Sequence, residues 1–282
     1  MQSIIKTSEL AALIHHKNVQ LIDARVGAHI KNAYEQQHLL GALHVDLDHD
    51  LANIKPNAAD GGRHPLPDIS AFAQLLGKLG IDPETHVVVY DAMNGANAAA
   101  RFWWMLRAVG HEKIQVLNGG FQTAIAEGFP TNFGLEIVEQ KLPYPLSISQ
   151  NWTLPMANMT EVEQVAQDPN YIVIDVRSPE RYRGEHEPID LIAGHITGAI
   201  NVPLTENSDK NGCFLPKETL KAHYAAIIGD RTTAQVIVHC GSGVTACHTL
   251  LAMDYAGFEM PKLYVGSWSE WSRNDKEIGL GE

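Results

Sequence analysis

The sequence predicts an α/β protein made of two tandem copies of one domain, each a mainly parallel sheet flanked by helices. Segments of the first half recur in the second half in the same order, and short β-branched runs alternate with longer helical patterns. The chain has 282 residues, which leaves room for about two domains of ordinary size.

The repeat consists of four pairs of matching segments. The first members are residues 21–25, 38–42, 87–91 and 118–121. Their counterparts are residues 173–177, 195–199, 236–240 and 265–268. The order is preserved and the spacing drifts by a few residues, as loop insertions would cause. The period is far too long for a solenoid, so we infer two copies of one domain.

Local patterns predict the elements inside each copy. β-Branched residues at 87–89 and 236–238 indicate strands that are buried on both faces. Each run leads through a turn of small residues into a helical pattern, over residues 98–108 and 245–255. Further helices are expected over three ranges: 68–80, 160–168 and 216–229. Glycine ends the first and the last of these three, as it commonly does at a helix C-terminus.

Composition indicates where the domains meet. Residues 129–152 are rich in proline and lack periodicity, so we interpret them as a linker. The chain then divides into an N-terminal domain, residues 1–128, and a C-terminal domain, residues 153–282.

Charge and cysteine content limit the class of protein. The formal net charge is −12, so neither a nucleic acid nor an anionic membrane surface is expected as a partner. The three cysteines are too scattered for a secreted disulfide framework or for a zinc site. No signal-peptide pattern is present at the N-terminus, and no apolar run approaches the length of a membrane span. We expect a cytoplasmic protein that uses no metal and no cofactor.

One cysteine lies in a pattern typical of a nucleophile. Cys240 follows a predicted strand and precedes two glycines, Gly241 and Gly243, and then a predicted helix. Glycines let successive backbone N–H groups turn toward one point, and the helix adds the positive end of its dipole. Both effects favour the thiolate, which is the nucleophilic form of cysteine. The first copy has Asp91 at this position, so we expect only the second copy to be catalytic.

Two enzymatic reactions use such a loop. A cysteine phosphatase needs an arginine where this sequence has Ala246, because a phosphate dianion requires a fork-shaped counter-charge. Carriage of a sulfur atom as a persulfide needs only the ring of amides. A non-catalytic binding module is the alternative from another class. Such a module would be expected to lose the cysteine and its loop, as the first copy has done.

The chain resembles the tandem-domain rhodanese-type sulfurtransferases, and among them the 3-mercaptopyruvate branch. The resemblance rests on the loop CGSGVTA and on supporting segments elsewhere: 101–104, 174–177, 194–199 and 266–271. It implies an inactive N-terminal domain, a catalytic C-terminal domain and an active site at their interface. It also implies that sulfane sulfur passes from 3-mercaptopyruvate through a Cys240 persulfide to a thiol, to cyanide or to a thioredoxin-like acceptor.

The resemblance also implies roles for individual residues. Cys240 would attack the donor sulfur, and Ser242 with His64 would handle protons, since histidine suits proton transfer near neutral pH. The third member of this relay would be Asp48, with Asp46 as the alternative. The substrate-binding residues would be Arg181, Arg63, Gly241, Gly243, Val244 and Thr245.

One departure from the family pattern concerns the donor. The family often has a second carboxylate-binding arginine where this chain has Ile189, and Arg63, Arg101 or Arg183 could replace it. A dianionic donor would be expected to require positively charged side chains in the loop, but the loop contains no Lys or Arg. We therefore predict 3-mercaptopyruvate as the donor, with thiosulfate as the alternative.

Overall fold

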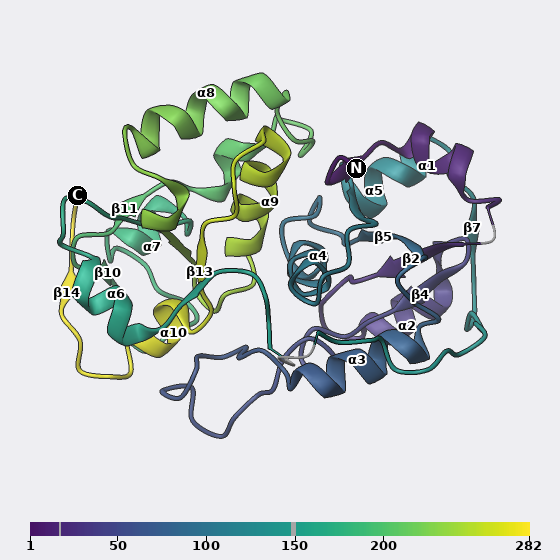
Figure 1. Cartoon of the computed structure of the whole chain (residues 1–282), viewed down its shortest axis with the longest axis horizontal. Coiled ribbons are helices and arrows are strands. Elements are labelled where there is room, and N and C mark those ends of the chain that lie inside the picture. Colours follow the sequence, from purple (N-terminus) through teal and green to yellow (C-terminus); the bar gives the residue numbers. More distant parts are fainter. Residues whose placement is uncertain (17, 148–150) are drawn as a thin grey trace. The chain divides into compact units, whose positions relative to one another are not determined.

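The computed structural model describes residues 1–16, 18–147 and 151–282, which form two compact units, each built on its own sheet (Figure 1). Unit 1 comprises Met1–Ala52, Leu66–Thr153 and Lys210–Cys213. Unit 2 comprises Asn53–Pro65, Leu154–Asp209 and Phe214–Glu282. The predicted linker continues unit 1 as far as it is described, and its residues 148–150 lie outside the described part.

Unit 1 contains a five-stranded sheet in which all neighbouring strands are parallel. In spatial order its strands are β1 (Ile4–Ile5), β6 (Ile114–Leu117), β5 (His86–Tyr90), β2 (Val19–Asp23) and β4 (Ala42–His44). A short antiparallel pair accompanies the sheet: β3 (His38–Leu39) and β7 (Thr131–Asn132).

Unit 2 repeats this topology with strands in the same chain and spatial order. Its parallel sheet contains β8 (Met156–Ala157), β13 (Lys262–Tyr264), β12 (Val236–His239), β9 (Ile172–Asp175) and β11 (Ile200–Asn201). Its antiparallel pair consists of β10 (His195–Ile196) and β14 (Ile278–Gly279). The predicted α/β class and the duplication are thereby confirmed.

Helices flank both sheets, and the five that the sequence predicts lie within a few residues of their predicted ranges. Unit 1 has α1 (Thr7–Leu13), α2 (Ile30–Gln36), α3 (Ile69–Lys78), α4 (Ala98–Ala108) and α5 (Gly120–Ala126). Unit 2 has α6 (Met159–Val165), α7 (Pro179–Tyr182), α8 (Lys217–Ile228), α9 (Ala246–Ala256) and α10 (Ser267–Trp271). Two short 3-10 helices also belong to unit 2: η1 (Leu204–Asn207) and η2 (Thr233–Gln235). The five helices that the sequence predicts are α3, α4, α6, α8 and α9.

The strand before the Cys240 loop, β12, and the helix after the Asp91 loop, α4, are deeply buried. All of β12 is buried, as its run of β-branched residues predicts for a strand covered on both faces. In α4 every residue except Arg107 is buried, and Trp103 and Trp104 belong to the core of unit 1. Dense packing on both sides holds the connecting loops between rigid supports.

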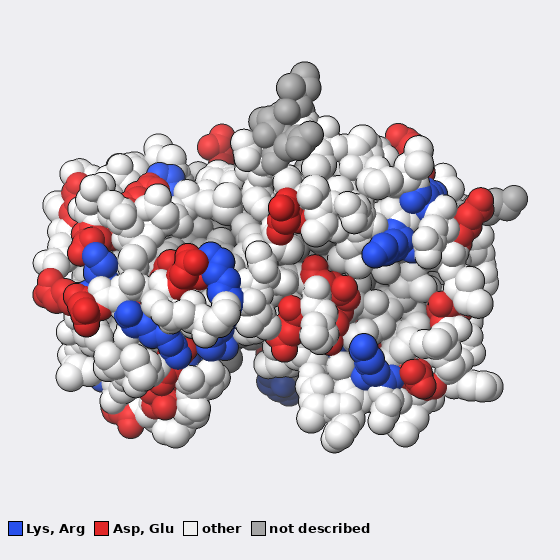
Figure 2. Space-filling model, turned by 90° about the horizontal axis from the view of Figure 1, so that it is seen from below, with Lys and Arg blue, Asp and Glu red and all other residues white. Residues whose placement is uncertain are grey.

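Figure 2 shows acidic and basic side chains mixed on the visible face, although acidic residues are in excess in the sequence. Among the described residues, no helix combines the length and the apolar character needed to cross a bilayer.

Candidate active site

Cys240 lies at the carboxyl end of the central strand of unit 2. It follows β12 directly, and residues 241–245 connect it to α9. Its exposed fraction is 1%, and Ser242 and Val244 in the same loop are also buried. The carboxyl end of a parallel sheet is the usual place for a binding crevice in α/β proteins.

Backbone geometry in this loop requires glycine at one position. Gly243 has φ +70°, and a Cβ there would overlap the carbonyl oxygen of Val265. Within the described chain, the backbone N–H groups of Gly241, Ser242, Val244 and Thr245 donate to no protein acceptor. The loop therefore offers donors for a group bound beside Cys240.

The corresponding loop of unit 1 is closed by its own side chain. The carboxylate of Asp91 accepts four backbone hydrogen bonds, from Met93, Gly95, Asn97 and Ala99, at 2.8 to 3.2 Å. Burial raises the pKa of Asp91, while these hydrogen bonds act in the opposite direction. The aspartate that replaces cysteine in this copy thus occupies the ring of amides itself.

A serine in an unusual conformation holds the backbone of Cys240. Ser267 is fully buried and has φ +54°, a left-handed conformation that is uncommon for a residue other than glycine. Its Oγ accepts a hydrogen bond from the Cys240 backbone N–H at 3.2 Å and donates one to the Tyr264 carbonyl at 2.8 Å. The Trp268 N–H donates to the Cys240 carbonyl at 3.0 Å. Both polar backbone groups of Cys240 are therefore fixed.

A segment from the N-terminal half of the sequence belongs to this site. Within Asn53–Pro65, the Gly61 N–H donates to Glu270 Oε1 at 2.9 Å and the Arg63 N–H donates to Ser269 Oγ at 3.0 Å. These bonds hold the segment against α10 and the residue before it, where Gly62 fits only because it lacks a Cβ. The next residue is His64, and its Nδ1 lies 2.8 Å from Ser242 Oγ, so the structure brings these two predicted residues together.

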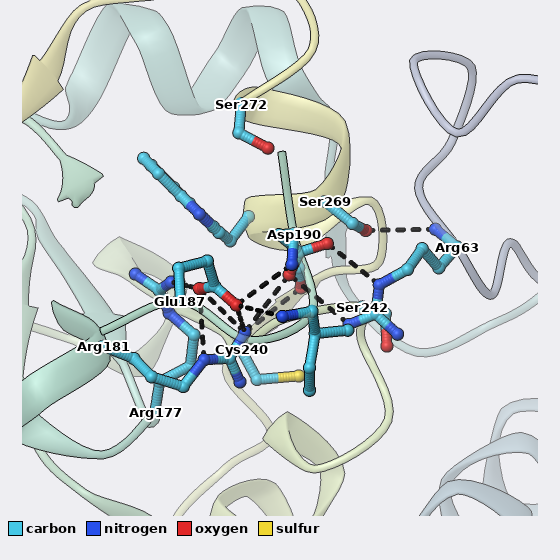
Figure 3. A network of polar contacts seen from close by, with 12 residues as sticks. Arg63, Arg177, Arg181, Glu187, Asp190, Cys240, Ser242, Ser269 and Ser272 are labelled. Carbon is cyan, nitrogen blue, oxygen red and sulfur yellow. Dashed lines mark hydrogen bonds and ion pairs between the residues drawn. The ribbon is translucent and has the colours of Figure 1, made fainter. Parts of the chain in front are cut away.

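Two arginines lie against the backbone of the cysteine loop (Figure 3). An ideal Cβ at Gly241 would be 3.0 Å from Arg63 Nη2 and 3.5 Å from Arg181 Nη2. Arg63 Nε donates to Asp190 Oδ1 at 2.9 Å, and Arg181 Nη2 donates to Asp190 Oδ2 at 3.2 Å. Of the three arginines considered as replacements at position 189, Arg63 is thus the one beside the loop.

The other two candidates lie elsewhere. Arg101 is buried in α4 of unit 1. Arg183 pairs with the exposed Glu185, with Nε 2.7 Å from its Oε1.

A second carboxylate holds Arg181 in place. Arg181 donates to both oxygens of Glu187, at 2.8 and 3.0 Å from Nη2, and Arg177 Nη1 donates to Glu187 Oε2 at 3.2 Å. Burial raises the pKa of Glu187, but hydrogen bonds from Arg181 and from the backbone N–H groups of Asp190 and Ile189 outweigh burial. The pKa of Glu187 therefore lies below its ordinary value.

The two candidate aspartates lie in a turn of unit 1 and differ in their bonding. Asp46 Oδ1 accepts the N–H groups of Asp48 and His49 at 2.9 and 3.0 Å, so its carboxylate stabilises the turn itself. Asp48 is exposed, and its carboxylate is not the group that closes this turn. The geometry of the turn favours Asp48 over Asp46 for a role outside it.

Sequence analysis missed three residues that the structure places at the site: Asp190, Ser267 and Arg273. Arg273 Nη1 donates to Asp190 Oδ1 at 3.3 Å. Neither Asp190 nor Arg273 lies in a recognisable sequence motif. A signal for Ser267 was available, since the repeat aligns it with Gly120, which has φ +62°.

Comparison with known proteins agrees with this architecture. The family model for the rhodanese-like domain matches residues 6–127 and 158–274. The chain therefore belongs to the rhodanese-like family and contains two copies of its domain. It is an enzyme of the sulfurtransferase class, as its similarity to the following proteins shows.

The chain is 36% identical to a probable 3-mercaptopyruvate sulfurtransferase of Pseudomonas aeruginosa over 274 residues, covering 95% of this chain and 94% of that protein. It is 34% identical to the thiosulfate sulfurtransferase of Mus musculus, covering 86% and 80% of the two chains. The crystal structure of the 3-mercaptopyruvate sulfotransferase SseA from Escherichia coli superposes with a TM-score of 0.78 at 29% identity, covering 96% of this chain and all of that one.

Proposed function

We propose that this sulfurtransferase takes sulfur from 3-mercaptopyruvate, carries it as a persulfide on Cys240 and passes it to a thiol or to cyanide. The observation that carries the proposal is the contrast between the two loops. In unit 1 four N–H groups converge on the Asp91 carboxylate, whereas those of Gly241, Ser242, Val244 and Thr245 donate to no protein acceptor within the described chain. A loop of this shape stabilises negative charge on the side chain at the strand end.

The reaction has two balanced steps. The Cys240 thiolate attacks the donor sulfur, an S–S bond forms, and the donor C–S bond breaks with its electron pair left on carbon. Protonation of the resulting enolate gives pyruvate. In the second step an acceptor thiolate or cyanide attacks the outer sulfur, and the Cys240 thiolate leaves. The amides of the loop hold the negative charge of the persulfide between the steps.

The remaining site residues receive roles consistent with their positions. Ser242 and His64 form a hydrogen-bonded pair that would deliver the proton to the enolate. We propose Asp48 as the residue that orients His64, because the Asp46 carboxylate is used in its own turn. Arg181 and Arg63 would bind the donor carboxylate, since both guanidinium groups lie against the Gly241 backbone.

Thiosulfate is the second candidate donor. Its attack by Cys240 would give the same persulfide and release sulfite. Arg63 and Arg181 would also contact this donor, because both guanidinium groups lie beside the loop, whose own sequence has no positive charge. Similarity to a thiosulfate sulfurtransferase also supports this alternative.

Donor choice is tested by steady-state sulfur transfer to cyanide with each donor in parallel. A charge-assisted contact to the carboxylate contributes roughly 1.5–3 kcal/mol, or about one to two powers of ten in rate. We expect kcat/KM for 3-mercaptopyruvate to exceed that for thiosulfate by at least about tenfold. Equal or faster turnover of thiosulfate would make the second candidate the function of this enzyme.

The nucleophile is tested by replacing each cysteine with serine. Cys240→Ser should abolish turnover with both donors, because serine cannot form a persulfide. Cys213→Ser and Cys247→Ser are matched controls and should retain most activity, since Cys247 packs inside α9 with its Sγ directed to the Gly243 carbonyl. Substantial turnover by Cys240→Ser would contradict the mechanism.

A further inference from the structure

Asp190 gathers the basic groups of the site around one carboxylate. Its side chain is fully buried, and it accepts hydrogen bonds from Arg63, Arg181 and Arg273 at 2.9, 3.2 and 3.3 Å. The three arginines come from separate parts of the sequence: the segment Asn53–Pro65, α7 and the residues after α10. Figure 3 shows Asp190 between Arg63 and Arg181, close to Cys240.

The charge of this cluster is nearly balanced. Its four arginines are Arg63, Arg177, Arg181 and Arg273, and its three carboxylates are Asp175, Glu187 and Asp190. Counted as ionised groups, they leave a single positive charge. That charge lies next to the nucleophile loop, because Arg63 Nη2, Arg181 Nη2 and Asp190 Oδ2 are all within 3.5 Å of an ideal Cβ at Gly241.

We propose that Asp190 determines donor specificity by limiting the positive charge at the mouth of the cysteine loop. The inference rests on the proposed function, since it concerns the choice between two anionic sulfur donors. A monoanion such as 3-mercaptopyruvate matches one net positive charge. A dianion such as thiosulfate brings a second negative charge close to the Asp190 carboxylate, which repels it.

The same interaction explains how the arginines can be ordered before the donor arrives. Asp190 and Glu187 hold the guanidinium groups in place, so little side-chain entropy is lost when a carboxylate binds. Asp190 has a second effect through its charge. Its carboxylate lowers the affinity of the site for every anion, and it lowers the affinity for a dianion more than that for a monoanion. The difference in affinity between the two donors is expected to equal the repulsion between the Asp190 carboxylate and one additional unit charge, several ångströms away in a partly buried site.

The experiment uses Asp190→Asn in the full-length enzyme. Asparagine keeps the size of the side chain and removes one negative charge. We expect the ratio of kcat/KM for thiosulfate to kcat/KM for 3-mercaptopyruvate to rise about three- to tenfold, mainly through KM for thiosulfate. Glu185→Gln is the matched control, because it removes the same charge from the exposed pair with Arg183 and should leave the ratio unchanged.

A second variant is expected to change the ratio of the two kcat/KM values in the opposite direction. Arg273→Gln removes one positive charge from the same cluster, so the ratio should fall below that of the wild type. If both variants change the two donors by equal factors, Asp190 only holds the arginines in position and the proposal is wrong. A fall of the ratio in Asp190→Asn would also overturn it.

A readout without any sulfur donor separates this proposal from the proposed function. The rate of Cys240 alkylation by iodoacetate, divided by that by iodoacetamide, reports the local potential at the thiolate. We expect this quotient to rise in Asp190→Asn and to fall in Arg273→Gln, as measured by mass spectrometry of the Cys240 peptide. The proposed function fails if the wild type prefers thiosulfate, whereas this proposal fails if the quotient does not move.

Discussion

The two copies use different residues at one left-handed position next to the strand-end residue. In unit 1 this position is Gly120, and the following residue, Phe121, donates its N–H to the Asp91 carbonyl at 2.9 Å. In unit 2 the position is Ser267, and the following residue, Trp268, donates its N–H to the Cys240 carbonyl at 3.0 Å. Glycine adopts this conformation without strain, whereas serine does not. The Ser267 hydroxyl accepts a hydrogen bond from the Cys240 N–H, and we propose this bond as the reason why serine is kept at the strained position.

Ser267→Gly should separate this function from stability. Losing the hydroxyl removes one hydrogen bond that positions Cys240, so we expect kcat to fall by about three- to tenfold. Glycine also relieves the left-handed strain, so the melting temperature should not fall. Ser267→Ala is the comparison, since it loses the same bond, keeps the strain and should melt lower. Unchanged kcat in both variants would show that the hydroxyl does not position the nucleophile.

Segment Asn53–Pro65 shows that unit 2, which contains Cys240, is not continuous in sequence. It provides Arg63 and His64 and is held by hydrogen bonds to Ser269 and Glu270. Gly62 in this segment approaches the Gly266 backbone too closely for any side chain, so the segment is packed tightly at this point. Packing of this segment therefore places His64 within hydrogen-bonding distance of Ser242 in the loop after Cys240.

A fragment of residues 153–282 tests the need for this segment. It retains Cys240 and the whole sheet of unit 2 but lacks Arg63 and His64. We expect it to fold poorly or to transfer sulfur at a small fraction of the rate of the full chain, measured with cyanide as acceptor. Circular dichroism distinguishes the two outcomes. Full activity of the fragment would show that Asn53–Pro65 contributes no catalytic group.

Duplication of one fold has left the enzyme with one loop that binds its own carboxylate and one that is open. Both units have the same strand order, so the difference in chemistry comes from single positions such as Asp91 and Cys240. The core of unit 2 also contains a histidine. His248, in α9, is almost fully buried, its Nδ1 lies 3.3 Å from Asn207 Nδ2, and its Nε2 has no partner among the described residues.

His248 should make the stability of the enzyme sensitive to acid. Burial lowers its pKa from 6.5 to about 3. Because the pKa is lower in the folded state, protons bind preferentially to the unfolded chain, and stability present above pH 6.5 is lost as the pH falls toward 3. The loss approaches about 1.4 kcal/mol per pH unit in this window. In urea unfolding at pH 7.5 and pH 5, His248→Gln should lose about 2 kcal/mol less than the wild type. An identical pH dependence would contradict the assignment.

Much of the fold could be predicted, and Cys240 could be proposed as the nucleophile, because the information is local. The β-branched runs, the helical patterns and the glycines after Cys240 act within a few residues, and the repeat doubles every such signal. The pairing of Ser242 with His64 was predicted through resemblance to a family, and the structure brings the two side chains to 2.8 Å.

Sequence by itself determined the α/β class, the duplication and the copy that carries the cysteine. Only the tertiary structure decided which charged groups surround that cysteine. Asp190, Arg63 and Arg273 are far apart in the chain, and nothing in their neighbours indicates that they meet. Long side chains from different segments converge through packing, which is a property of the folded chain and leaves no periodic signal in its sequence. The balance of charge at the site therefore emerges only when the unit has folded.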